Sequence, residues 1–140
     1  MSASGAGMQD RPTLLELLDA VRGFLEKDAG DALEGTAKFH ARVAANVLAI
    51  VARELELEPA QLAAEWQRLD ALLGPAAAPD EPDALRDALR RRTEELCARI
   101  RRGAADSGSY RDAVLAHVRA TVCDKLMIAN PKLRVAAARA

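Results

Sequence analysis

Aromatic side chains are scarce in this sequence, and their scarcity narrows the fold class. Only four of the 140 residues are aromatic, whereas 31 are alanine and 19 are leucine. Strands favour aromatic and β-branched residues, while helices favour Ala and Leu. The composition therefore predicts an all-α fold, and no segment alternates between apolar and polar residues as a half-buried strand would.

Cysteines are also few, and long apolar runs are missing. Cys97 and Cys123 lie on separate predicted helices without metal-ligand spacing, so we expect both to be reduced and packed as small apolar side chains. The N-terminal MSASGAGMQ lacks the charged start and apolar stretch of a signal peptide, and no run reaches membrane-spanning length. We therefore expect a cytoplasmic protein that does not contact a membrane.

The small net charge of −1 conceals an uneven distribution. Residues 1–85 carry 15 acidic and 7 basic side chains, and residues 86–140 carry 6 acidic and 13 basic ones. Opposite charges on the two halves favour packing of one half against the other within a chain, or association of two chains as a homodimer. Within one domain the intramolecular arrangement is the simpler interpretation.

Length and local signals predict one domain built from about five helices. We expect a disordered tail over 1–9, a single helical bundle over 10–131, and a tail or frayed helix extension over 132–140. Thr13 and Glu16 have the spacing of a capping box. The Gly74–Pro82 segment, with three prolines, predicts a mobile linker. The expected helices begin near Thr13, Lys38, Pro59, Asp83 and Ser109.

The helix expected over 38–58 is apolar almost all the way round, which is typical of the centre of a bundle. We therefore predict that it is the most buried helix, with Val47 and Ile50 in the core. Polar side chains interrupt its apolar surface, and each would need a partner if buried. These residues are His40, Arg42, Asn46 and Arg53.

The last helix carries a second polar set, His117, Thr121, Asp124 and Lys125. A His and an Asp on adjoining turns could form an acid–base pair, and Lys125 or Arg42 could hold an anion. The structural alternative is that Asp124 ties this helix to the central one through an ion pair, and we favour it. We expect Asp124 to hydrogen-bond to one of Arg42, Asn46, Arg53 or Lys125.

Metal and nucleic-acid functions find little support. His40 and His117 are the only histidines, and neither has the Glu three residues earlier that di-metal bundles use, so we expect no metal and no cofactor. Seven arginines lie between Arg86 and Arg102, yet the chain has neither an overall basic charge nor interleaved aromatics. We expect these arginines to be solvated or paired with acidic residues.

Three strings, RPTLLELL, ALEG followed by KFHARVAANVLAIVARELEL, and VRATVCDKLMIANPK, cover much of the chain. They resemble a bacterial family of small helical proteins defined by a domain of unknown function. The most specific motifs are FHARVAAN and DKL…NP. The resemblance implies gene neighbours that encode aminoglycoside-phosphotransferase-like kinases and acyl-CoA dehydrogenases, and hence a pathway of acyl-CoA or hydroxyacyl metabolism. It implies no catalytic residue.

Two functions therefore remain open. The first is an accessory protein without catalytic activity that binds the kinase-like protein or the dehydrogenase. The second is a binding protein for a small anionic or acyl-type ligand, or a minor enzyme, with its polar site between the helix over 38–58 and the last helix. A closed polar cluster would favour the first function, and polar side chains that line an open cavity would favour the second.

Overall fold

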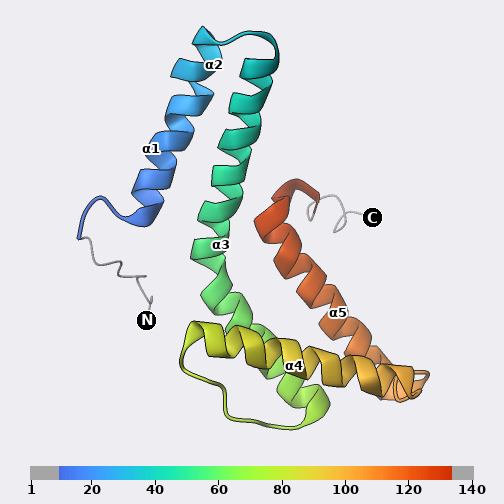
Figure 1. Cartoon of the computed structure of the whole chain (residues 1–140). Helices are drawn as coiled ribbons and strands as arrows, with labels where there is room; N and C mark the ends of the chain where they lie inside the picture. Colours follow the sequence, from blue (N-terminus) through green and yellow to red (C-terminus); the bar gives the residue numbers. More distant parts are fainter. Residues whose placement is uncertain (1–9, 134–140) are drawn as a thin grey trace. The chain divides into compact units, whose positions relative to one another are not determined.

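The computed structural model describes residues 10–133, and every regular element in this stretch is a helix (Figure 1). The all-α prediction is confirmed. The chain divides into two compact units, with the boundary between Glu56 and Leu57. The predicted tail over 1–9 lies outside the described residues, as does all but the first two residues of the one over 132–140.

The first unit begins with α1 (Leu14–Glu26) and α2 (Asp28–Ala32) and ends within the long helix α3 (Gly35–Leu73). The predicted capping box is confirmed: the Thr13 backbone N–H donates to Glu16 Oε2 at 2.7 Å, and the Glu16 N–H donates to Thr13 Oγ1 at 3.2 Å. These two bonds satisfy backbone donors that the first helical turn cannot pair, so the start of α1 is set locally.

Within the first unit, α1 runs antiparallel to the first part of α3, and both helices line a shallow pocket (Figure 1). The buried α3 residues of this unit are small, namely Ala41 and Ala45, while Leu48 and Ala49 line the pocket and are partly buried. Val47 is 51% exposed and Ile50 is only partly buried, so the prediction that 38–58 is the most buried helix, with both residues in the core, is wrong.

Pro59 lies inside α3, whereas the sequence predicts that it begins a new helix. Proline has no N–H to donate to the Leu55 carbonyl, and this usually kinks or ends a helix. Here the helical backbone continues to Leu73, although the boundary between the two units falls only three residues before Pro59. Residues 10–133 form five helices, the expected number, but two of the expected helices are one and α2 is additional.

The hydrophobic core lies in the second unit, which contains the end of α3, α4 (Pro82–Arg101) and α5 (Gly108–Ala129). α3 and α4 contribute three buried residues each to this cluster, and α5 contributes one. Leu69 is 0% exposed and occupies the centre of this cluster. The buried members are Trp66, Leu69, Leu72, Ala88, Leu89, Leu96 and Val114.

The connection between α3 and α4 is tied down where it leaves α3. Gly74 ends the helix with a φ of 103°, in the left-handed region that glycine tolerates best. The Trp66 indole N–H donates to the Ala76 carbonyl at 3.2 Å, and the Ala76 N–H donates to Asp70 Oδ1 at 3.2 Å. These bonds attach residues 74–76 to α3, and the mobility expected for the whole segment stays a prediction.

Candidate functional site

The second unit carries an open groove of about 630 Å³, lined by α3, α4 and α5. Ile100 and Arg101 belong to the end of α4 before the loop to α5, whereas Arg86 lies near the start of α4 and Lys125 near the end of α5. The walls are mainly apolar. Their apolar side chains are Leu62, Leu89, Leu96, Ile100, Val118 and Val122.

Three residues of the predicted polar set, His117, Thr121 and Lys125, line this groove. His117 is 6% exposed, and its Nδ1 atom has no hydrogen-bond partner among residues 10–133. Burial lowers the pKa of His117, and the nearby Arg68 cation lowers it further, against a smaller opposing effect of Glu65. The imidazole is therefore neutral at pH 7, and it leaves a polar group in the wall without a partner.

Asp124 holds α5 to α3 through Arg68. Arg68 Nη2 lies 3.0 Å from Asp124 Oδ2 and 3.5 Å from Thr121 Oγ1, and the Gln61 side chain donates to the Asp124 carbonyl at 3.0 Å. The Asp124 carboxylate is therefore engaged by an arginine, as the structural interpretation requires. Arg68 lies outside the set in which this partner was expected, namely Arg42, Asn46, Arg53 and Lys125.

The remaining predicted residues, His40, Arg42, Asn46 and Arg53, belong to the first unit. His40 is exposed, and its ring centroid lies 5.9 Å from that of Phe39. Arg42 and Asn46 are also exposed, while Arg53 is partly buried beside α1. Water can satisfy the exposed side chains, so the desolvation penalty that suggested a site among them does not apply to three of the four.

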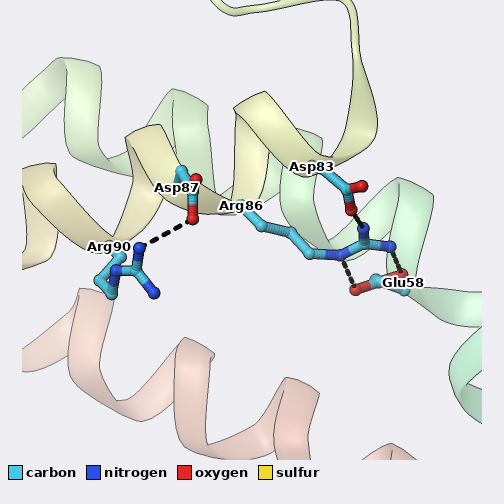
Figure 2. Close-up of polar contacts among 5 residues, drawn as sticks. All are labelled: Glu58, Asp83, Arg86, Asp87 and Arg90. Atoms are coloured by element: carbon cyan, nitrogen blue, oxygen red, sulfur yellow. Dashed lines mark hydrogen bonds and ion pairs between the residues drawn. The ribbon is translucent and has the colours of Figure 1, made fainter.

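The basic residues at the start of α4 are paired with carboxylates, as expected. Arg86 donates to both Glu58 oxygens, at 2.7 and 2.5 Å, and also to Asp83, while Arg90 pairs with Asp87 at 2.8 Å (Figure 2). The two bonds from Arg86 lower the pKa of Glu58. This paired fork connects α3 to α4 within the second unit.

Other arginines of α4 satisfy the last carbonyls of α3. Arg92 donates to the Gly74 carbonyl at 2.6 Å, and Arg99 donates to the Leu72 carbonyl at 3.3 Å. The Tyr110 hydroxyl also donates to the Leu72 carbonyl, at 3.2 Å. A helix end leaves carbonyls without intrahelical donors, so these side chains stabilise the terminus of α3 and have a structural role.

The α3 residues of the groove and its polar cluster were not predicted from the sequence. Gln61 and Arg68 are seven residues apart, which places them on one face of a helix after two turns, and Glu65 lies between them on that face. The expected helix break at Pro59 divided this region from the polar set of the central helix. A polar face that continues for two turns was the signal that could have identified them.

The residues that could hold a metal are dispersed. Among residues 10–133, no three His, Cys, Asp or Glu side chains come together as a metal ion would require. Cys97 and Cys123 are both free. Within the same stretch, no helix is long and apolar enough to cross a membrane.

These features define the chain as a small all-α protein with an apolar groove in its second unit. Residues 31–133 match the family described as Domain of unknown function (DUF6285), and the chain belongs to this family. The match includes all of α3, α4 and α5. No curated protein and no solved structure matches the chain.

Proposed function

We propose that this chain is an accessory protein that binds a partner enzyme through the apolar surface of its first unit. The observation that carries the proposal is the α3 stripe, which we define as Phe39, Val43, Val47, Val51 and Leu55. These side chains recur every four residues, so each lies next to the following one in a stripe that winds around the helix, and they are 39–62% exposed.

The stripe is not an isolated feature of the first unit. None of the residues of α1 is buried, and this helix exposes further large apolar side chains. An accumulation of exposed large apolar side chains is uncommon on proteins that act alone and is typical of binding surfaces. The exposed apolar residues of α1 are Leu14, Leu15, Leu17, Val21 and Phe24.

The polar set meets both criteria in part, because Asp124 is closed off by Arg68 whereas His117, Thr121 and Lys125 line the open groove. A binding role nevertheless agrees better with these groups than catalysis does. The His117–Asp124 acid–base pair would need Asp124 to accept from the imidazole, whereas Asp124 is engaged by Arg68 and His117 Nδ1 has no partner in the described chain. The exposed ring of His40 has an aromatic neighbour, Phe39, rather than an acid. Neither histidine is therefore activated as a general base.

The partner that we propose is an aminoglycoside-phosphotransferase-like kinase, with an acyl-CoA dehydrogenase as the second candidate. This choice rests on the family resemblance given above. The first unit carries nine acidic and six basic side chains, a net charge of −3 over residues 1–56. A partner surface with an apolar centre and a basic rim would match it, because rim charges set the orientation of binding.

The test is co-expression of the tagged chain with each candidate enzyme from the same genome, followed by affinity capture and mass measurement of the complex. We expect Val47→Asp to weaken capture at least about tenfold, because it places a charge within an apolar interface. Gln67→Asp, at an exposed position of the same helix, is the matched control. Equal capture of both variants, or no complex with either enzyme, would refute the proposal. Self-association of the chain through the stripe would also refute it.

A further inference from the structure

The groove of the second unit shares no residue with the α3 stripe, so the proposed docking of a partner enzyme does not account for it. Its volume of about 630 Å³ falls within the roughly 300–1,000 Å³ typical of small-molecule sites. Val118 and Val122 are 44% and 50% exposed on its α5 wall. A narrow apolar molecule that covered these side chains would remove their surface from water.

One polar group breaks this apolar wall. His117 is nine-tenths buried and lines the groove, and one of its ring nitrogens has no partner in the described residues. Buried polar groups normally have a hydrogen-bond partner, and an unpaired one is costly. Thr93 and Thr121 add two hydroxyl groups to the same lining. The groove can therefore accept a molecule with at least one polar atom.

The charged groups of the lining favour an anion. The lining contains four cations, Arg86, Arg90, Arg101 and Lys125, and two carboxylates, a formal excess of two positive charges. Arg86 and Arg90 are paired with carboxylates, whereas Lys125 and Arg101 have no carboxylate partner among residues 10–133. Of these two, Lys125 shares α5 with the exposed Val118 and Val122, so we assign the anionic group to it.

We propose that this groove binds an amphiphile with a medium-length apolar chain and one anionic head, such as a free fatty carboxylate. The head lies beside Lys125 and Arg90, and the chain extends along Val122 and Val118 toward Ile100. This orientation places the anion beside an unpaired cation and the chain against the apolar walls. The Lys125 ammonium donates to the carboxylate, and no covalent step is involved.

The experiment is calorimetric titration of the full chain with decanoate below its micelle-forming concentration. Decanol and decyltrimethylammonium provide the same chain with a neutral and a cationic head. We expect decanoate to bind most tightly, decanol to bind more weakly and the cationic amphiphile to bind least. No measurable binding of decanoate, or equal binding of all three probes, would overturn the proposal.

Two variants of the groove locate the site. We expect Lys125→Met to weaken decanoate binding about three- to tenfold while leaving decanol binding unchanged, since it removes only the charge on the head. Val122→Asp places a carboxylate in the wall and should weaken binding of both probes at least about tenfold. Val47→Asp is the matched control, because Val47 is 51% and Val122 50% exposed.

Circular dichroism first establishes that each variant keeps the helix content of the unmodified chain. Lys125 and Val122 are both exposed, so we expect both variants to fold. Binding that survives both groove variants, or that Val47→Asp weakens equally, would place the ligand elsewhere and refute the assignment. Loss of the kinase complex on Val47→Asp with decanoate binding retained would separate this site from the proposed docking surface.

Discussion

Replacement of Leu69 by Ala is the most direct test of where the core lies. Leu69 is 0% exposed and sits among the buried side chains of α3, α4 and α5. Truncation of a fully buried leucine removes its transfer free energy and leaves a cavity, which together cost about 3–5 kcal/mol. A chain of this size is stable by only about 5–15 kcal/mol, so the variant should be strongly destabilised.

The second unit contains an intrinsic fluorescent probe of its own unfolding. Trp66 is the only tryptophan and is buried in the same cluster, so its fluorescence reports unfolding of the second unit in a urea titration. Leu115→Ala is the matched control, because it makes the same chemical change on α5 at a position that is 39% exposed. Less surface is uncovered there, so we expect a cost of about 1–2 kcal/mol.

The difference in free energy of unfolding between Leu69→Ala and Leu115→Ala tests whether Leu69 lies in the core. A free energy of unfolding that falls by the same amount in both variants would contradict the assignment of the core. The slope of the urea dependence must also be unchanged between the variants, since a changed slope would report a different unfolded or native state rather than a lost contact.

Three further predictions follow from the second unit. Asp124→Asn should lower the free energy of unfolding by about 1 kcal/mol, because the partly exposed pair with Arg68 loses its charge, and this loss should vanish when Arg68 is already Gln. Folding lowers the pKa of His117 from 6.5, so the unfolded chain takes up a proton first as the pH falls. The free energy of unfolding should therefore be highest above that pH and decrease below it. The variant His117→Gln should show a weaker pH dependence in urea titrations. In hydrogen exchange, the Ala76 amide should be protected by its bond to Asp70, whereas faster exchange at Ala76 than at Ala78 would contradict that bond.

The features that the sequence predicted correctly are encoded within a few neighbouring residues. The Thr13–Glu16 capping box and the stop of α3 at Gly74 depend on side-chain oxygens or backbone freedom within a single turn. Such signals do not require knowledge of distant contacts. The all-α fold was predictable for the same reason, since helix propensity is a property of each residue.

Pro59 shows where a local signal is ambiguous. Proline suits the first turn of a helix, and it is also tolerated inside a long helix when the lost hydrogen bond is offset by other contacts. The residues after Pro59 pack into the core of the second unit, with Leu62 beside the buried cluster. These contacts are distant in sequence, so the continuation of α3 could not be inferred from the residues around Pro59.

The partner of Asp124 could not be predicted from the sequence either. An ion pair between α3 and α5 joins residues 56 positions apart, and several arginines were compatible with it. The sequence indicated that the carboxylate needed a cation, which is a requirement of its chemistry. It could not indicate which cation, because that choice depends on how two helices cross.

The burial of the helix over 38–58 was predicted wrongly, because an apolar pattern indicates that a surface is covered but not whether this chain or another molecule covers it. The covered side of α3 in the first unit is formed by alanines such as Ala41 and Ala45, whereas Phe39 and Val47 are exposed. A core would place the large side chains inward, since they bury more surface and fill more volume. The opposite arrangement, with alanines buried and most large apolar side chains exposed, is expected when another molecule covers the large ones. Side-chain size around the helix is therefore the feature that connects the sequence to the proposed docking surface, and Val47→Asp tests it directly.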